Sequence, residues 1–337
     1  MKTIAMAEIN ESTKRTGDYK NIKRTGNIIG LKALYRKELA DHLTSKRFII
    51  IMLLIWGTSF ASLYGALSGV ADSTSDYLFL DLYTLSGNSI PSFMNFIALL
   101  GPFVGLILGF DAINKERTAG TLNRLVANPI HRDSIIIGKF LAGCTVITIM
   151  VFTMGILIGA AGVLSTGQIP QAEEVGRIIV FLFFTVVYMA FWLGLSIFFS
   201  VVCKHSATSA MDVIACWLFF AIFMTLVANI VAGIVYPVST EWDYLLNGYN
   251  NYVFEQNLNR ISPYYLFSEA ASTIMNPSVR TVNVITYDQV DGAISGYLSF
   301  GQSVLLVWPH LVALFALMAA SFVGSYIGFM RQEVRSN

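Results

Sequence analysis

Residues 111–139 form the one segment of this chain whose residue types indicate a specific task. The segment is charged and lies between two long apolar runs. Residues 114–127 fit a helix with Leu122 and Leu125 on one side, and Pro129 follows the end of the pattern. We expect a short cytoplasmic helix, tied at both ends to membrane spans, that docks on a partner in water. The alternative is an inner loop that is basic only because inner loops of membrane proteins are basic.

The sequence lacks the patterns of nucleotide hydrolysis and of metal catalysis. Gly138-Lys139 is followed by Phe140 and has no upstream glycine at the spacing of a phosphate-binding loop. The histidines and cysteines show no spacing typical of metal ligands. They are His42, His131, His205, His310, Cys144, Cys203 and Cys216. We therefore expect no catalytic residue, no metal and no cofactor in this chain.

Asp212 is an acidic residue one to two turns inside an apolar run. One interpretation is a polar contact that lines a translocation path, because charged residues inside membrane spans usually serve function. The other is an acid near the inner membrane surface, paired with Lys204 or with a neighbouring helix. The sequence leaves both interpretations open.

Gly101, Gly105 and Gly109 repeat at every fourth residue of the second apolar run. Small residues at this spacing give a helix one flat face, along which another helix can approach closely. We expect this face to pack tightly, either within the monomer or across a dimer, or to border a translocation path.

Composition places the chain in a membrane. Hydrophobic residues make up 55% of the 337 residues and charged residues only 13%, whereas a soluble domain has about 25% charged residues. Six apolar runs are long enough to cross about 30 Å of hydrocarbon. They are residues 48–70, 93–110, 135–164, 178–203, 207–236 and 304–330. The net charge of +1 gives no electrostatic reason to expect nucleic acid as a partner.

The distribution of Lys and Arg predicts the orientation of these spans. If both termini are cytoplasmic, 19 of the 22 Lys and Arg residues lie on the inner side of the membrane. Only Arg177, Arg260 and Arg280 lie outside. We therefore predict an all-α polytopic membrane protein with six transmembrane helices and with both termini inside.

The spans form one domain over residues 48–330, flanked by polar segments. Residues 1–30 are polar, and we expect a disordered cytoplasmic N-terminus. Residues 31–47 fit an amphipathic helix on the membrane surface, with an imperfect apolar stripe because Glu38 falls near its edge. A coupling loop occupies 111–134, a long outer loop 237–303 and a cytoplasmic tail 331–337. Within the outer loop, Ser262-Pro263 predicts the start of a helix.

Two groups of residues resemble the membrane subunits of type-2 ABC (ATP-binding cassette) transporters. The first group is Glu116, Arg117, Gly120, Thr121, Leu122, Leu125, Pro129, Ile130, Arg132, Gly138 and Lys139. The second is Ser262-Pro263, Glu269-Ala270 and Asn276-Pro277, which resemble the outer loop before the last span of that family. The resemblance covers about residues 31–331. The longer polar N-terminus departs from it.

The resemblance implies partners and a mechanism. Two permease chains, identical or related, would sit on two copies of a separately encoded ABC ATPase, which would hold the ATP and Mg²⁺. Glu116, Arg117, Gly120, Thr121, Leu122, Leu125 and Arg132 would contact the ATPase and transmit its closure. The second and fifth spans would line the cavity. The expected location is the plasma membrane of a prokaryote, in contact with lipid.

Three functions are compatible with these features. The first is export of an amphipathic or lipid-like compound, since the spans carry few charges. The second is maturation or mechanical transmission outside the cell, as in relatives such as the permease that assists copper-site assembly in nitrous oxide reductase. The outer loop 237–303 would then bind an extracytoplasmic protein. The third is an intramembrane enzyme or scaffold outside the ABC class.

Overall fold

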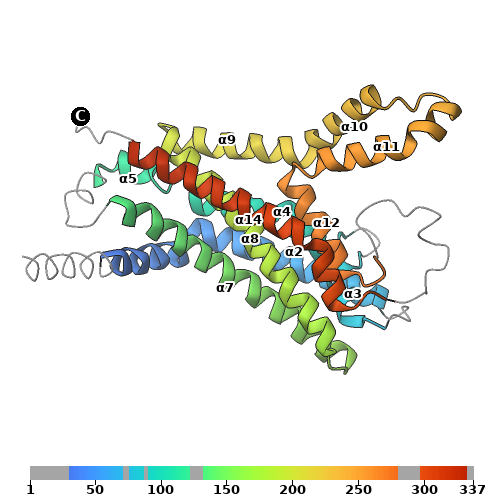
Figure 1. Cartoon of the computed structure of the whole chain (residues 1–337). Coiled ribbons are helices and arrows are strands. Elements are labelled where there is room, and N and C mark those ends of the chain that lie inside the picture. The colour runs from blue at the N-terminus through green and yellow to red at the C-terminus, as the bar shows by residue number, and fades with distance from the viewer. Residues whose placement is uncertain (1–29, 71–75, 87–89, 122–131, 280–296, 332–337) are drawn as a thin grey trace, which may run out of the picture.

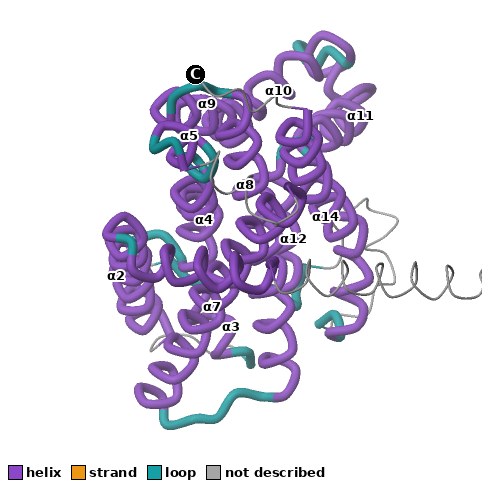
Figure 2. The backbone as a smooth tube through the Cα atoms, turned by 90° about the vertical axis from the view of Figure 1, so that its left-hand side faces the viewer, coloured by secondary structure: helices purple, strands orange, loops and turns teal. Residues whose placement is uncertain are grey.

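The computed structural model describes residues 30–70, 76–86, 90–121, 132–279 and 297–331, and in these ranges every regular element is a helix (Figures 1 and 2). Residues 30–44 are helical and are followed by a break at Ser45. The labelled helices are α2 (Lys46–Val70), α3 (Leu78–Thr84), α4 (Phe93–Gly109), α5 (Asn114–Thr118), α7 (Arg132–Thr166), α8 (Ala172–Val202), α9 (Ser206–Leu218), α10 (Met224–Val235), α11 (Glu241–Asn259), α12 (Pro263–Met275) and α14 (Phe300–Arg331). A π-helical turn, η1 (Phe219–Phe223), joins α9 to α10.

The prediction of six spans is confirmed. Six of the described helical segments are long and apolar enough to cross a membrane. The first four correspond to α2, α4 with α5, α7 and α8. The fifth is α9–η1–α10, and the sixth is α14. Helix α8 begins at Ala172, six residues before the apolar run predicted for the fourth span. Its polar first turn is stabilised by a capping box between Gln171 and Glu174.

Helix α8 is the centre of the bundle and packs against α4, α7, α12 and α14. The three glycines of α4 lie on its α8 face. A Cβ atom at Gly105 would lie 2.6 Å from the backbone nitrogen of Leu193 and 2.7 Å from the Met189 carbonyl oxygen. The close packing expected of this face therefore occurs within one chain, against the backbone of α8.

Pro102 lies inside α4 without ending it. Proline has no N–H to donate to the carbonyl four residues earlier, which here belongs to Ala98. The Tyr188 hydroxyl of α8 donates a hydrogen bond to that carbonyl over 3.0 Å. A neighbouring helix thus satisfies the acceptor that the proline leaves unpaired, as a membrane interior requires.

The segment between the last two spans is more helical than the sequence indicated. The helix predicted after Ser262-Pro263 is present as α12, but α11 was not predicted, because its apolar residues follow no clear helical period. Helices α10 and α11 form a hairpin that projects beyond the bundle at the end away from α5 (Figure 1). The Ser262 hydroxyl donates to the Phe220 carbonyl over 2.7 Å and so joins α12 to the π-helical turn.

The predicted helix over residues 114–127 is wrong in extent. Helix α5 ends at Thr118, because Gly120 adopts a positive φ of 67°, a left-handed conformation that stops an α-helix. The rest of that prediction lies outside the described residues. The described chain begins and ends at the same end of the bundle, where α5 also lies (Figure 1).

Candidate functional site

The short helix α5 is held by side chains from other helices. Five residues are too few to form a stable helix in isolation. The first buried N–H groups of this turn, those of Ile113 and Asn114, both donate to the hydroxyl of Ser200 on α8, over 3.0 and 3.3 Å. Ser200 therefore acts as an N-terminal cap contributed by another helix.

Arg117 binds the carboxyl end of α8. Its guanidinium donates to the carbonyl oxygens of Val201 and Cys203, each over 3.1 Å. A cation is favourable at a helix C-terminus, where the last carbonyls lack helical partners. Together with Ser200, Arg117 fixes α5 to the C-terminal end of α8.

Glu116 binds in the opposite direction, toward α7. Only 7% of Glu116 is exposed, and its Oε1 accepts a hydrogen bond of 2.8 Å from Lys139 Nζ, which is itself 4% exposed. The residue implied as an ATPase contact is therefore buried, and its carboxylate is paired inside the chain.

Lys139 has a second acidic partner, on the helix of residues 30–44. Its Nζ lies 3.0 Å from Oε1 of Glu38, which is also buried. Lys37 lies on the rim, 2.9 Å from the same oxygen and 3.7 Å from Glu116 Oε1. Burial opposes ionisation of Glu38, but the two lysines outweigh it and hold its pKa below the ordinary value. The acid that interrupts the apolar stripe of this helix is thus the acid that pairs with α7.

The four residues Lys37, Glu38, Glu116 and Lys139, here called the Lys139 cluster, border a cavity of about 980 Å³. The cavity lies between the helix of residues 30–44, α5 and the facing ends of α2, α4, α8 and α9. Exposed residues on its α5 side are Lys115, Thr118, Ala119 and Thr121. These exposed residues, rather than Glu116, are available to contact a partner.

The remaining residues implied for coupling have separate positions. Gly120 and Thr121 are exposed, and the Thr121 hydroxyl donates to the Glu116 carbonyl over 3.3 Å. The Arg132 guanidinium lies over the Phe329 ring of α14, 5.7 Å from its centroid. Leu122 and Leu125 lie outside the described residues.

Asp212 lies on α9, close to the end of α8. The Cys203 thiol donates to its carboxylate over 3.0 Å. Burial and the neighbouring Asp212 carboxylate raise the pKa of Cys203 to about 11. Asp212 is therefore a junction between the ends of the fourth and fifth spans at the α5 end of the bundle.

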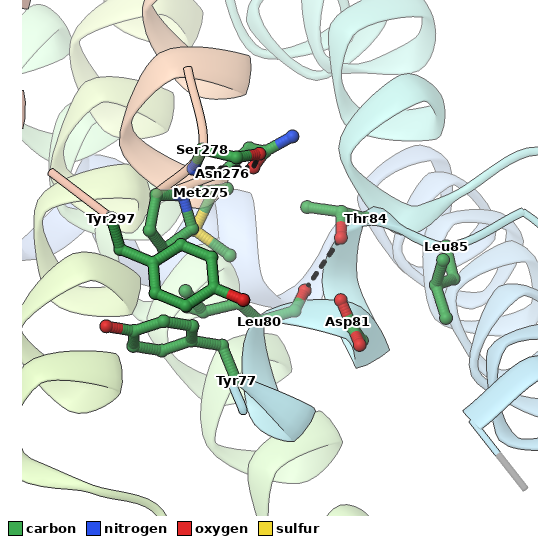
Figure 3. Close-up of a pocket in the computed structure, with 10 residues that line it drawn as sticks. Tyr77, Leu80, Asp81, Thr84, Leu85, Met275, Asn276, Ser278 and Tyr297 are labelled. Atoms are coloured by element: carbon green, nitrogen blue, oxygen red, sulfur yellow. Dashed lines mark hydrogen bonds between the residues drawn. The ribbon is translucent and has the colours of Figure 1, made fainter. Parts of the chain in front are cut away.

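A second cavity, of about 590 Å³, lies at the end of the bundle away from α5 (Figures 1 and 3). It lies between α3 and the end of α12. The rings of Tyr77 and Tyr297 meet edge to face, 5.2 Å apart, beside Met275 (Figure 3). Its size suits a small molecule. Nowhere in the described ranges do three or more His, Cys, Asp or Glu side chains form a metal site.

A carboxylate joins three helices near this second end. Glu269 of α12 accepts two hydrogen bonds from Arg260, at 2.9 and 2.8 Å, and lies 2.6 Å from His310 Nε2 of α14. Burial opposes ionisation of Glu269, but His310 and Arg260 outweigh it, so its pKa lies below the ordinary value. Sequence reasoning placed Glu269 in a family motif but assigned it no partner.

Comparison with known proteins identifies relatives over most of the chain. A family model described as ABC-2 family transporter protein matches residues 32–334. The chain is similar to a probable ABC transporter permease protein NosY of Pseudomonas aeruginosa, with 27% identity over 221 residues, 63% of this chain and 76% of that protein. It is also similar to the probable ABC transporter permease protein NosY of Stutzerimonas stutzeri, with 28% identity over 144 residues, 42% of this chain and 48% of that protein.

Proposed function

Because this chain belongs to the ABC-2 family of transporter proteins, as a permease subunit of an ABC transporter, we propose that α5 and the residues around it receive the movement of a partner ATPase. The observation that supports this assignment is the set of junctions that hold α5. A five-residue helix is attached to α8 through Ser200 and Arg117 and to α7 through Glu116. A push on α5 would therefore reach two spans directly.

The proposed contact surface is the exposed side of the same turn. Lys115, Thr118, Ala119, Gly120 and Thr121 are exposed. In this proposal they touch the ATPase, together with Leu122, Leu125 and Arg132 from the implied motif. Glu116 and Arg117 hold the turn in place. Both termini are cytoplasmic, and the membrane is the plasma membrane of a prokaryote.

The proposed complex has two ATPase copies and two permease chains. The fifth span is the least buried of the six, with 17% of its most apolar window buried. Phe219, Ile222, Leu226, Ile230 and Ile234 are among its exposed apolar residues. A second permease chain and membrane lipid would cover this surface, since large exposed apolar areas mark interfaces.

Export of an amphipathic compound is the proposed work of the complex. Phe103 of α4 packs against Trp217 of α9, with ring centroids 4.8 Å apart. On the side of α4 away from the glycines, Leu99 is 42% exposed. This side, between the second and fifth spans, offers aromatic and aliphatic contacts, which suit a substrate with a large apolar part.

The test of ATPase coupling is purification of the tagged chain from its host in mild detergent. An ABC ATPase should accompany the wild-type chain in a one-to-one ratio. The double substitution Thr118→Glu and Thr121→Glu on the exposed side of α5 should reduce the ATPase recovered by at least tenfold. Lys32→Glu, on the exposed face of the helix 30–44, is the matched control. Equal ATPase recovery with the wild-type chain and with the α5 variant would reject the assignment.

A second candidate function is mechanical transmission to an extracytoplasmic protein. The projecting hairpin favours it, since α11 exposes Trp242, Tyr244, Leu245, Leu246 and Tyr249. Between residues 237 and 259 the chain has acids but no Lys or Arg. A partner of the hairpin would therefore present apolar and basic groups. Crosslinking from a photoreactive residue at Leu246 separates the two functions: capture of one secreted protein favours the second, and capture of lipid alone favours export.

A further inference from the structure

We propose that Lys139 is a positioning residue that makes the helix of residues 30–44, α5 and α7 move as one unit when the ATPase acts. This inference rests on the proposed function. It names the Lys139 ammonium group as the link that joins α5 to α7 and to the helix of residues 30–44. Its basis is the Lys139 cluster, in which one buried ammonium group binds carboxylates from two different elements, at 3.0 Å on the 30–44 helix and 2.8 Å on α5.

The charge balance of the cluster shows why Lys139 is central. Glu38 and Glu116 are 6% and 7% exposed, so both carboxylates are largely removed from bulk solvent and depend on a nearby cation. Lys139 is the cation that lies between them, and it is 4% exposed. Lys37 contributes from the rim, where half of its side chain is exposed, and it also binds Asp41 at 3.2 Å. Without Lys139, two buried carboxylates would face each other with only a rim lysine between them.

Besides its attachment to α8, helix α5 is joined to the helix of residues 30–44 through the Lys139 cluster. Ser200 and Arg117 tie α5 to α8 through the hydrogen bonds described above. The 30–44 helix approaches α7 elsewhere through Tyr35, whose hydroxyl donates to Thr145 over 2.9 Å. Lys139 is therefore the residue at which the 30–44 helix, α5 and α7 meet.

A paired charge of this kind stabilises a fold in any case, so the test must separate positioning from folding. The chain is assembled with its ATPase in lipid nanodiscs, with Cys144, Cys203 and Cys216 replaced by alanine. A spin-label pair at Ala40→Cys and Ala119→Cys, both at exposed positions, reports the distance between the 30–44 helix and α5. This distance is measured in the chain without ATPase, because Ala119 lies on the proposed contact surface. The accessibility of Leu99→Cys to a maleimide reports the surface between the second and fifth spans that is proposed to contact substrate, without nucleotide and with ATP plus vanadate.

Lys139→Met should broaden the Ala40–Ala119 distance distribution and abolish the nucleotide-dependent change at Leu99, while ATPase still copurifies. Lys139→Arg should restore both readouts. The exchange of charges in Lys139→Glu with Glu116→Lys should restore them better than either single substitution. The control Lys32→Met removes an exposed lysine of the helix of residues 30–44 and should change neither readout.

Three results would overturn the inference. The first is a narrow distance distribution and a normal Leu99 response in Lys139→Met. The second is failure of Lys139→Arg to restore either readout in protein that still binds ATPase. The third is absence of an ATPase from the wild-type preparation, which would remove the proposed function itself. A broadened distance in ATPase-free Lys139→Met would then show that the cluster holds the helices but has no coupling role.

Discussion

At the scale of single residues, the effect of replacing a glycine of α4 depends on which atoms of α8 lie opposite it. A Cβ atom at Gly101 would come within 3.0 Å of the Met189 methyl group, the end of a flexible side chain. A Cβ atom at Gly105 would meet only backbone atoms of α8, three of them at 2.6–2.9 Å. Backbone atoms cannot move aside without shifting a helix. The same substitution should therefore have different effects one turn apart.

Gly105→Ala should lower the stability of the fold by roughly 1–3 kcal/mol, the usual range for overpacking a well-packed core. Gly101→Ala should cost less, because Met189 can change rotamer. Gly57→Ala on α2 meets nothing within 4 Å and should be neutral or stabilising, by up to about 1 kcal/mol, since alanine favours helix. Thermal unfolding midpoints in detergent rank the three variants. Equal midpoints for Gly105→Ala and Gly57→Ala would contradict the packing described.

Ser200→Ala should loosen α5 without disturbing the spans. It leaves the buried N–H groups of Ile113 and Asn114 unpaired, at a cost of roughly 1–3 kcal/mol for buried donors. The control is Ser196→Ala one turn earlier. Its hydroxyl donates to the Leu106 carbonyl over 3.0 Å, and that carbonyl keeps a helical bond from the Phe110 N–H. Hydrogen exchange should speed up at residues 113–118 in Ser200→Ala only. Unchanged exchange there would show that Ser200 is not the cap of α5.

At the scale of helices, Glu269 fixes the base of the projecting hairpin. Arg260 follows the last residue of α11, Glu269 is on α12, and His310 is on α14. One carboxylate therefore sets the angle between the hairpin and the last span. The contacts of Glu269 and the hydrogen bond from the Ser262 hydroxyl to the Phe220 carbonyl both lie at the connection between α11 and α12. The base of the hairpin is rigid, whereas its outer faces remain exposed.

The lowered pKa of Glu269 predicts a dependence on acid. A group whose pKa is lower in the folded state stabilises the fold above its unfolded pKa, about 4.3 for Glu, and loses that contribution as pH falls through the folded value. Glu269→Gln should therefore be less stable than the wild type at pH 7, by roughly 1–3 kcal/mol. The difference should shrink below about pH 4. Unfolding midpoints at pH 7 and in acid measure both.

The control for this effect is Glu241→Gln, an exposed acid in the first turn of α11. It should change stability little at either pH. A difference between the wild type and Glu269→Gln that stays constant down to pH 3 would show that the carboxylate is not held ionised by Arg260 and His310.

At the scale of the whole molecule, the two ends of the bundle differ in charge and in shape. The end with α5 holds the Lys139 cluster and the pair between Arg47 and Asp111, 2.6 Å apart. The opposite end holds α3, α12 and the hairpin (Figure 1). The asymmetry of Lys and Arg along the sequence predicts that the α5 end faces the cytoplasm. All the contacts proposed for the ATPase lie at that end.

This orientation can be measured by labelling intact cells with a membrane-impermeant maleimide. In a chain without native cysteines, Leu246→Cys on α11 should be labelled from outside. Lys32→Cys should be labelled only after the cells are opened. Both positions are exposed, so a lack of labelling cannot be due to burial. Labelling of Lys32→Cys in intact cells would reverse the orientation and remove α5 from the reach of a cytoplasmic ATPase.

The sequence predicted the membrane architecture well because hydropathy acts over whole segments. The six spans and α12 follow from apolar runs and from Ser-Pro at a helix start. Helix α11 was missed because asparagine and tyrosine interrupt its apolar pattern. The end of α5 was misplaced because glycine is compatible with a helix until its φ is known. Lys139 lies about 100 residues from its partner Glu38, and Ile113 lies 87 residues from its partner Ser200, so no local pattern shows these contacts.

The π-helical turn at Phe219–Phe223 places one residue more in the fifth span than an uninterrupted α-helix would hold there. The Phe220 carbonyl in this turn accepts the Ser262 hydroxyl. Because the wide turn absorbs the extra residue, the helix after it keeps nearly the orientation of an uninterrupted α-helix. Deletion of one residue from 219–223 should therefore restore an ordinary helix with the hairpin still facing the same way, whereas deletion of one residue within α10 should rotate the chain after it by about 100° about the helix axis. The turn thus marks a place where the fifth span can lose a residue without turning the hairpin.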